Sequence, residues 1–398
     1  MKFLTIALCI ALLSHEIIAQ TCLPNGIGFS QESIDNFSVN YPGCTQILGS
    51  VTIEGGYITN LNGLSALTSI GGNLNVYDTD SLTSLMGLSA LTTIEGQLYI
   101  SNNAALTSLT GLSALTNIGG YIEIYNNDAL TNLTGLSVLN STGGYLRIYN
   151  NETLTSLTGL DALSSIEGFL EIYDNPSLMS LAALSSLTSI GGSLTLENNS
   201  ALTSLMGLNA LISIGGSLQI YDNSALTSLT ALSALTSIEG YLNIQNNSAL
   251  TSLIGLENID HTTITSLNLK NSGMLYLCEV KSICDYLAIP SNLAYIFGNA
   301  IGCAAREQVE AACIAEPTNN IEHDEVNVFP NPTTGIIEIQ STNTDDGTIR
   351  LMDNMGRLIK ALDFPDTKQM DLNKQPNGMY FIEIITDRRL TLKRIVKE

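Results

Sequence analysis

Basic residues are scarce in this 398-residue chain, which has 15 Lys and Arg against 37 Asp and Glu. Between Val51 and Leu269, Arg147 is the only Lys or Arg. Residues 326–398 contain equal numbers of acidic and basic residues, so the net charge of -22 belongs to residues 1–325. An acidic surface repels phosphate groups. We therefore expect neither nucleic acid nor an anionic membrane among the partners.

Histidine is equally rare, and the common catalytic motifs are missing. The three histidines are His15, His261 and His323, and no G-x-S-x-G, P-loop or dinucleotide-binding motif occurs. Glu123 and Glu171 could form a glycosidase pair. However, Arg147 is expected between them, where it stabilises the charged form of both carboxylates and disfavours a general acid. We predict no enzymatic activity and no cofactor.

Long apolar segments are absent, with one short exception at the N-terminus. Residues 1–19 combine Lys2, an apolar stretch from Phe3 to Leu13 and the small Ala19. This pattern is typical of a secretory signal peptide. The stretch is too short to cross a bilayer as a helix. We therefore predict an exported chain with no transmembrane segment.

Cysteine is missing from the central, repeated part of the chain. Apart from Cys9, two cysteines precede the repeats and four follow them: Cys22, Cys44, Cys278, Cys284, Cys303 and Cys313. An even number in an exported chain favours disulfides, with a zinc site as the alternative. Cys22–Cys44 is the local pair at the N-terminal end. The last four cysteines allow three pairings, and the sequence does not choose among them.

A 24-residue repeat dominates what the sequence does contain. The unit reads G-x-L-x-I-Y-x-N-x-x-L-T-S-L-x-G-L-x-A-L-T-S-I-x, and a fixed period of this length indicates a solenoid. In "YLRIY" (145–149), Leu146 and Ile148 point to one side, and Tyr145, Arg147 and Tyr149 to the other. The following leucines recur at every third residue, which suits short extended pieces joined by turns. We predict an all-β solenoid over residues 48–270, with a continuous leucine core.

Two further columns mark the corners of the predicted coils. Asparagine recurs at Asn103, Asn127, Asn151, Asn175, Asn199, Asn223 and Asn247. Asparagine tolerates turns and can bond to the backbone or to the asparagine of the next coil. The alternative is calcium binding by carboxylates near these corners: Asp78, Asp80, Asp128, Asp174 and Asp222. Glycine pairs such as Gly143-Gly144 predict a second corner that needs a permissive backbone.

The stretch "LTSIGGSLTLENNSALTSLMGL" (187–208) resembles the receptor L-domain, a right-handed β-helical relative of leucine-rich repeats. The resemblance covers residues 48 to about 270 and implies a right-handed β-solenoid. The coils are more regular than in that family, so no ligand-binding residues are carried over. Solenoids need end caps. We predict an N-terminal cap at residues 20–47 and a disulfide-bonded cap at 271–313, with a short helix at "AREQVEAAC" (305–313).

The C-terminal part forms a separate module. Residues 314–325 are polar and contain a proline, which predicts a linker. In residues 326–398, alternating runs separated by Pro, Asn and Gly predict a small β-sandwich. This module resembles the type A sorting domain of type IX secretion cargo, on the matching residues Phe329, Pro330, Asn331, Pro332, Gly335, Gly356, Gly378, Met379, Tyr380 and Lys393. The resemblance implies that the outer-membrane secretion machinery is a partner and that the protein is extracellular or on the cell surface.

Three consecutive coils carry aromatic residues at both flanking outward positions and a charge at the centre. We call these nine residues the ring platform: Tyr121, Glu123, Tyr125, Tyr145, Arg147, Tyr149, Phe169, Glu171 and Tyr173. Aromatic and opposite-charge pairs stabilise neighbouring strands, so one interpretation is purely structural. The other is an exposed patch that binds a glycan or a protein. We predict a monomeric surface protein for adhesion or ligand binding, with a structural matrix component as the alternative.

Threonine columns suggest a third hypothesis, ice binding. They run along Thr83, Thr107, Thr131, Thr155, Thr203, Thr227 and Thr251, with a second row at Thr68, Thr92, Thr116, Thr188 and Thr236. The second row is expected on a different side of the coil. No strand carries a Thr-x-Thr doublet, which weakens this hypothesis.

Overall fold

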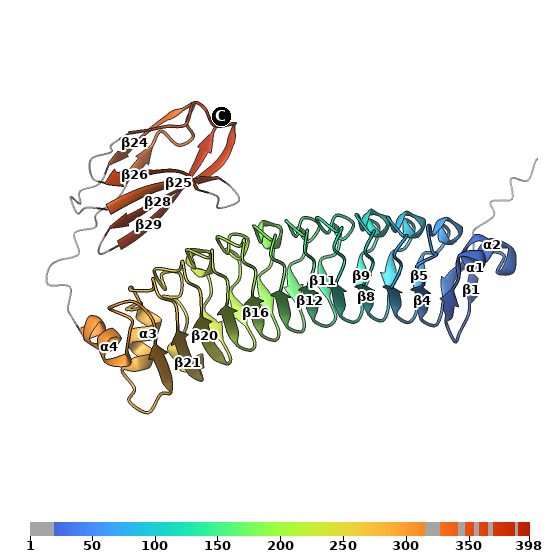
Figure 1. The fold of residues 1–398 in the computed structure, drawn as a ribbon, viewed down its shortest axis with the longest axis horizontal. Coiled ribbons are helices and arrows are strands. Elements are labelled where there is room, and N and C mark those ends of the chain that lie inside the picture. Colours follow the sequence, from blue (N-terminus) through green and yellow to red (C-terminus); the bar gives the residue numbers. More distant parts are fainter. Residues whose placement is uncertain (1–19, 315–326, 341–346, 354–357, 365–368, 387–388) are drawn as a thin grey trace, which may run out of the picture.

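The computed structural model describes residues 20–314, 327–340, 347–353, 358–364, 369–386 and 389–398. Its main feature is an elongated β-solenoid of regularly stacked coils (Figure 1), which confirms the predicted fold class. The predicted signal peptide lies outside the described residues, as does the predicted linker except for Ile314. No helix in the described part of the chain is long and apolar enough to cross a bilayer.

One long parallel sheet runs along the whole solenoid. Each strand pairs with the equivalent residues of the next coil, so that Arg147 lies opposite Glu123 and Glu171. Its twelve strands are β2 (Ile27–Phe29), β4 (Val51–Glu54), β6 (Leu74–Tyr77), β8 (Leu98–Ser101), β10 (Ile122–Tyr125), β12 (Leu146–Tyr149), β14 (Leu170–Tyr173), β16 (Leu194–Glu197), β18 (Leu218–Tyr221), β20 (Tyr241–Gln245), β21 (Ser266–Lys270) and β22 (Ala294–Phe297).

Shorter strands form a second wall of the coils. One five-stranded sheet holds β1 (Gln20–Cys22), β3 (Cys44–Ile47), β5 (Ser69–Ile70), β7 (Thr93–Ile94) and β9 (Asn117–Ile118). The other holds β11 (Ser141–Thr142), β13 (Ser165–Ile166), β15 (Ser189–Ile190), β17 (Ser213–Ile214) and β19 (Ser237–Ile238). Single 3-10 turns complete several coils: η1 (Asn62–Leu64), η2 (Met86–Leu88), η3 (Thr110–Leu112), η4 (Ala182–Leu184), η5 (Thr230–Leu232) and η6 (His261–Thr263).

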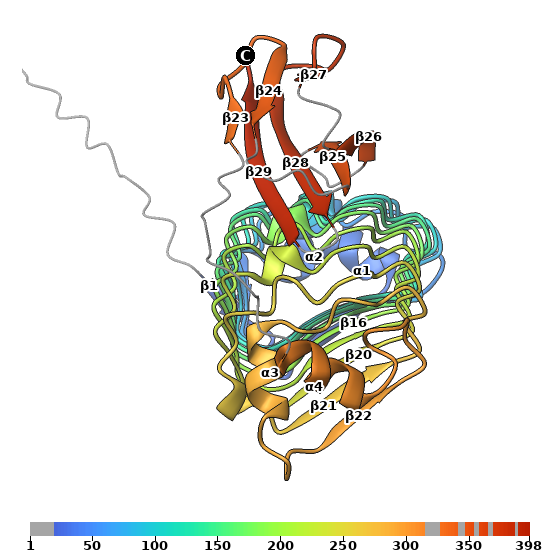
Figure 2. The ribbon, with the colours of Figure 1, turned by 90° about the vertical axis from the view of Figure 1, so that its left-hand side faces the viewer.

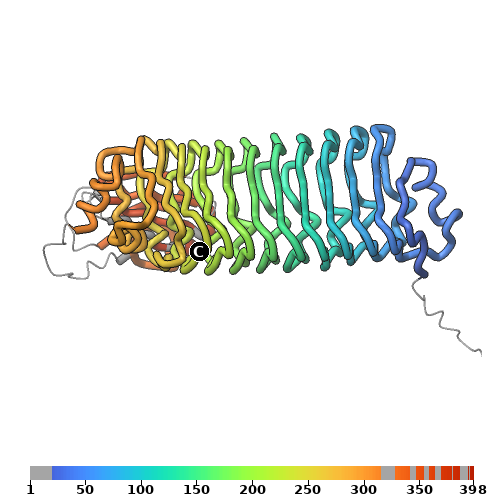
Figure 3. The backbone as a smooth tube through the Cα atoms, turned by 90° about the horizontal axis from the view of Figure 1, so that it is seen from below, coloured from blue at the N-terminus to red at the C-terminus, as the bar shows by residue number. Residues whose placement is uncertain are grey.

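The core is the continuous leucine column that the repeat predicts. In the coil that follows Arg147, Leu154, Leu157, Leu160 and Leu163 are all fully buried, and Ile166 is 1% exposed. Successive coils superimpose when the solenoid is viewed along its length (Figure 2), and the backbone trace shows the same regularity from another side (Figure 3). Each leucine therefore packs against its own copies in the coils on either side.

The asparagine column is a buried hydrogen-bonded ladder. The Asn151 amide donates to the carbonyls of Ile124 and Tyr149, at 3.2 and 3.0 Å. Its oxygen accepts the backbone N–H of Asn127 at 3.1 Å. The same bonding recurs along the column, and every asparagine in it is fully buried. The ladder satisfies backbone groups that would otherwise be buried without partners.

The residue before each ladder asparagine turns the corner. Asp78, Asn102, Asn126, Asn150 and their later equivalents have φ between 51° and 59°, a left-handed conformation that Asn and Asp adopt more readily than most residues. The glycine pairs were expected to provide a permissive backbone, and this explanation is wrong. Gly143 and Gly144 do not have positive φ. A side chain at Gly143 would instead lie 2.1 Å from the Gly119 carbonyl of the previous coil.

Disulfides hold both ends, and all six cysteines of the described chain are paired. Cys22 bonds Cys44, as expected. At the other end the pairs are Cys278–Cys303 and Cys284–Cys313, which excludes zinc binding by these thiols.

Helices in both caps complete the ends of the solenoid. The predicted helix is present as α4 (Arg306–Ile314), but α1 (Gln31–Asp35), α2 (Phe37–Asn40) and α3 (Lys281–Leu287) were not expected. They lie where the repeat stops and no periodic pattern marks them.

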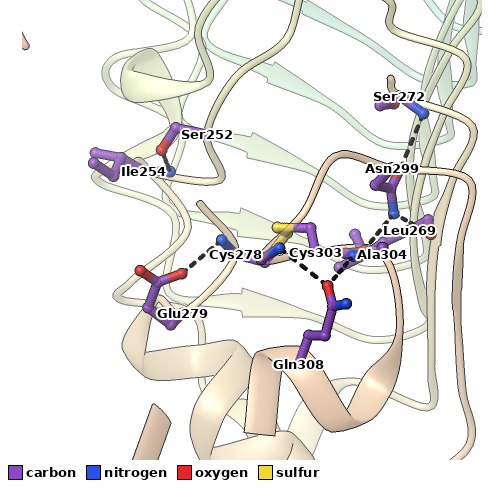
Figure 4. The surroundings of a disulfide bond; sticks show 11 residues. Ser252, Ile254, Leu269, Ser272, Cys278, Glu279, Asn299, Cys303, Ala304 and Gln308 are labelled. Carbon is purple, nitrogen blue, oxygen red and sulfur yellow. Dashed lines mark hydrogen bonds between the residues drawn. A yellow bond between two sulfur atoms is a disulfide. The ribbon is translucent and has the colours of Figure 1, made fainter. Parts of the chain in front are cut away.

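The C-terminal cap also closes the asparagine ladder (Figure 4). Asn247 donates its backbone N–H to the Ser272 hydroxyl, and Ser272 N–H donates to the Asn299 side-chain oxygen at 3.0 Å. The Asn299 amide then reaches the Leu269 and Cys303 carbonyls, at 2.8 and 3.1 Å. The Cys278–Cys303 disulfide thus anchors the end of the ladder. The sequence analysis missed Ser272 and Asn299 because they fall outside the 24-residue period.

The C-terminal module consists of two antiparallel sheets around its own core, as predicted. One sheet contains β23 (Asn327–Phe329), β24 (Ile336–Gln340) and β27 (Gln369–Asp371). The other contains β25 (Gly347–Asp353), β26 (Leu358–Phe364), β28 (Gly378–Thr386) and β29 (Arg389–Lys397). Its core includes Ile337, Ile349, Tyr380 and Ile382.

Several sorting-signal residues lie together at one end of this module. The Asn331 side chain accepts the Val396 N–H at 2.9 Å, and Thr333 N–H donates to the Val396 carbonyl. The segment that contains Pro330 and Pro332 is therefore bound to the basic final strand β29. Gly335 is buried, Gly378 begins β28, buried Tyr380 lies two residues further, and Lys393 is on β29. Gly356 lies outside the described residues.

We predict that Asn151→Ala lowers the free energy of unfolding by about 3 kcal/mol, since it leaves the Ile124 carbonyl and the Asn127 N–H buried without partners. Asn150→Gly is the matched control, because glycine adopts the left-handed corner conformation freely and is expected to change stability by less than about 1 kcal/mol. Urea unfolding of the full chain measures both. Equal losses for the two variants would show that the ladder contributes nothing beyond the corner.

Candidate functional site

The ring platform lies on three neighbouring strands, β10, β12 and β14. Their parallel register places Tyr125, Tyr149 and Tyr173 in one row, and Glu123, Arg147 and Glu171 in the row beside it. Tyr121, Tyr145 and Phe169 precede the three strands and form the third row. The structure therefore brings together all nine residues on the outer face of the long sheet.

The six rings form two stacks of three. In the first stack, Tyr145 lies between Tyr121 and Phe169, with ring centroids 4.3 and 4.4 Å apart and planes within 8°. In the second, Tyr149 lies between Tyr125 and Tyr173, at 4.4 and 4.6 Å, with planes within 11°. These separations follow the spacing of neighbouring strands, which is about 4.8 Å. The ring normals therefore run along the solenoid, and the ring edges point outward.

The central row is a hydrogen-bonded ionic network. Arg147 Nε lies 2.7 Å from a Glu171 oxygen, and its guanidinium is 3.6 Å from Glu123. Glu123 is 9% exposed and also accepts hydrogen bonds from the Tyr145 and Tyr149 hydroxyls, at 3.3 and 3.2 Å. The one arginine of the repeats thus has a defined structural role. It supplies the cation that two partly buried carboxylates need.

Arg147 also connects the charged row to the first ring stack. Its guanidinium carbon lies 5.1 Å from the Tyr145 ring centroid and 5.0 Å from that of Phe169. These distances fall within the range of cation–π attraction. The cation, two carboxylates and both stacks therefore form one connected and rigid assembly.

Further tyrosines extend the assembly toward the N-terminus. Tyr99 packs edge-on against Tyr125, with its hydroxyl against the Tyr125 hydroxyl, and Tyr77 packs edge-on against Tyr99. The sequence analysis did not include Tyr77 and Tyr99 in the ring platform, because it selected only coils with aromatic residues at both flanking positions. Reading the sequence one column at a time could not show that rings from different columns contact each other.

The central tyrosines of the platform hold their protons tightly. Burial raises the pKa of Tyr145 and Tyr149 above the ordinary range for tyrosine, and the negative charge of Glu123 adds to this effect. Burial likewise raises the pKa of Tyr99 to about 12. The neutral hydroxyls remain hydrogen-bond donors, which the bonds to Glu123 require.

A shallow polar groove borders the second stack. It has a volume of about 420 Å³ and is lined by the corner residues that follow the tyrosines, among them Asn126, Asn150 and Asp174, together with Asp128 and Glu152. The other outward positions between β4 and β20 carry rings, amides, hydroxyls or carboxylates, with no aliphatic side chain. The face therefore combines aromatic carbon with many hydrogen-bonding groups.

The structure also bears on the alternative hypotheses. Within the described residues, no three His, Cys, Asp or Glu side chains converge as metal ligands, and the corner residues Asp78, Asp174 and Asp222 serve the turn. Threonine hydroxyls donate to the carbonyl of the previous coil, as in Thr107 to Thr83 at 3.1 Å. The geometry therefore gives the calcium and ice-binding hypotheses no additional support.

We predict that Arg147→Met destabilises the solenoid by about 2 kcal/mol, because Glu123 is left partly buried without its cation. Lys281→Met is the control, since the Lys281–Asp285 pair is exposed and such pairs contribute little. Thermal melting reports both. The double variant Arg147→Met/Glu123→Gln should recover part of the loss, and no recovery would contradict the assigned ion pairing.

The raised tyrosine pKa values give the fold an alkaline limit. The folded chain holds these protons more tightly than the unfolded chain, where tyrosine titrates near pH 10. The resulting stabilisation is complete below about pH 10 and is lost as pH rises through the folded-state values. Tyrosinate absorbance should therefore show some of the 15 tyrosines ionising only above about pH 11. Tyr149→Phe should remove one of this late group, whereas ionisation of all tyrosines near pH 10 in the folded chain would contradict the prediction.

Comparison with known families agrees with both resemblances. The model of the secretion system C-terminal sorting domain matches residues 327–398, and that of the receptor L domain matches residues 43–110. No curated protein matches the chain. The sorting domain indicates export to the cell surface or outer membrane, with the type IX secretion machinery as a partner. The L-domain match covers the first coils, and the structure continues the same coil geometry through β21.

Proposed function

We propose that this chain, which carries a type IX sorting domain at its C-terminus, is a non-enzymatic surface protein that binds extracellular glycans. The ligand-binding surface is the outer face of the long sheet, centred on the ring platform. The observation that carries the proposal is the preorganised assembly of six stacked rings around Glu123, Arg147 and Glu171. A rigid surface loses little conformational entropy when a ligand binds.

The chemistry of the face favours a glycan over a protein ligand. A sugar presents C–H patches, which suit aromatic carbon, and hydroxyl groups, which suit amides, hydroxyls and carboxylates. Both kinds of group are present on the platform and along the groove beside it. A stable protein interface usually has an apolar, well-packed core, and this face offers no aliphatic residue for one.

A purely structural role is the second candidate. Stacked rings and alternating charges also stabilise neighbouring strands, by about 0.2–1 kcal/mol for each pair. Such a component of a surface layer would have the same ladder without any ligand. Neither candidate uses Glu123 or Glu171 as a catalytic residue. The bonds that these carboxylates make to Arg147 and to two tyrosine hydroxyls support the proposal of a non-enzymatic role.

A glycan array separates these candidates. We expect the wild-type chain to bind at least one class of glycan, and Tyr145→Ala/Tyr149→Ala to lose about tenfold or more in affinity, because it removes the central ring of both stacks. Tyr57→Ala is the control, since Tyr57 is 62% exposed and outside the platform. Melting curves check that the double variant remains folded.

Other results of the array would change the conclusion. Binding by neither wild type nor variants would favour the structural role. Equal binding by wild type and the double variant would place the ligand elsewhere. Release of shorter sugars from the array would show that the protein is an enzyme.

A further inference from the structure

The first ring stack ends abruptly at Phe169. One face of Phe169 lies against Tyr145 at a centroid distance of 4.4 Å. On the other side, the pairing of β14 with β16 aligns Phe169 with Ser193. In the described part of the chain, Phe169 has no second ring neighbour. Its outer face is therefore an open end of the stack, whereas the faces of Tyr145 are covered on both sides.

The next position in the row of the first stack carries a small residue in place of a ring. Rings in this stack are 4.3 and 4.4 Å apart, and a serine replaces the ring at the next position. We call this space the Ser193 slot. It does not continue to the following coil as an equally open space, because Ser217 is only 7% exposed. The more open part of this row therefore lies directly beside Phe169.

The floor and the border of the slot are polar. Ser193 Oγ accepts the Ser217 N–H at 3.0 Å, a bond that does not use the hydroxyl's own proton. Glu171 occupies the central row beside Phe169, and its side chain is 25% exposed. In the next coils, the Gln219 amide is held against Thr195. The space thus has one aromatic wall and several groups that can bond to hydroxyls.

Phenylalanine at position 169 differs from the other rings of the platform. The other five rings of the platform are tyrosines, and hydroxyls of the central two donate inward to Glu123. Phe169 is the one platform ring without a hydroxyl, and it stands at the open end. Its free face and edge are entirely apolar.

We propose that the Ser193 slot is the primary sugar subsite, in which one pyranose ring stacks its C–H face on Phe169. This inference rests on the proposed glycan binding and specifies where it occurs. Ring edges cannot offer the flat contact that a sugar face requires, so the outward surface of the stacks is a poorer platform than their open end. An aromatic side chain from a protein would remove water from the Ser193 hydroxyl and from Glu171 without offering them a new hydrogen bond. A pyranose bonds to that floor through its hydroxyls.

The test substitution places a new ring in the Ser193 slot, which blocks the slot and keeps the ring stack. In Ser193→Tyr the new ring lies in register with Phe169 and extends the stack, as Tyr145 does in the preceding coil. We expect a melting temperature at or above that of wild type, together with at least a tenfold loss of affinity. Ser113→Tyr is the matched control, because Ser113 is exposed at the end of η3, and we expect unchanged binding. The probes are glucan, mannan and galactan oligosaccharides, measured by isothermal titration on the full chain.

Each result has a defined meaning. Loss of binding in Ser193→Tyr alone supports the slot. Wild-type affinity in Ser193→Tyr, with loss in Tyr145→Ala/Tyr149→Ala, overturns the slot but leaves the proposed function intact. Wild-type protein that binds none of these oligosaccharides overturns both. A slot variant that blocks only a protein ligand contradicts the assignment to a sugar.

Discussion

The structure depends on the hydrogen bonds of a buried asparagine that recurs in most coils. In the middle of the column each side chain bonds to its own coil and to both neighbours, as Asn151 does with Tyr149, Ile124 and Asn175. A shift of one coil against the next would leave several buried polar groups without partners, which is costly. The ladder therefore fixes the register of the strands. Register in turn brings equal positions into columns, so that rings meet rings and Arg147 meets its carboxylates.

The contacts on the long sheet explain why the repeats contain so few cations. Elsewhere on the long sheet, carboxylates bond to hydroxyls, as Glu54 does with Tyr77 and Glu197 with Tyr221. Only Glu123 and Glu171 flank a shared neighbour closely enough to require a charge between them. The platform is consequently the one part of the repeats where attraction between opposite charges adds to stacking.

Repetition made most of the fold predictable from sequence. Strands, leucine core, ladder and outward columns all follow from a period that eight leucines mark. The caps lack that period, so α1, α2 and α3 had no pattern to reveal them. Cysteine pairing at the C-terminal end depended on how the cap folds, and spacing left it open.

The sequence predicted which residues form the candidate site, but not which of their surfaces are exposed. Column reading placed the six rings on the outer face, and the register confirms that they are neighbours. It did not show that the rings stand upright and cover one another's faces, because side-chain orientation follows from packing rather than from alternation. That orientation is the reason that we propose a ligand site at the end of a stack and not on the outward ring edges.

Because the coils from β6 to β20 close the same cycle of 24 residues, the chain can change length by whole coils without disturbing its chemistry. One extra copy between β14 and the C-terminal cap would join the ladder, the leucine core and both walls at once. It would also move the platform about 4.8 Å further from the C-terminal end. The number of coils therefore sets the length of the outer face independently of the contacts within each coil.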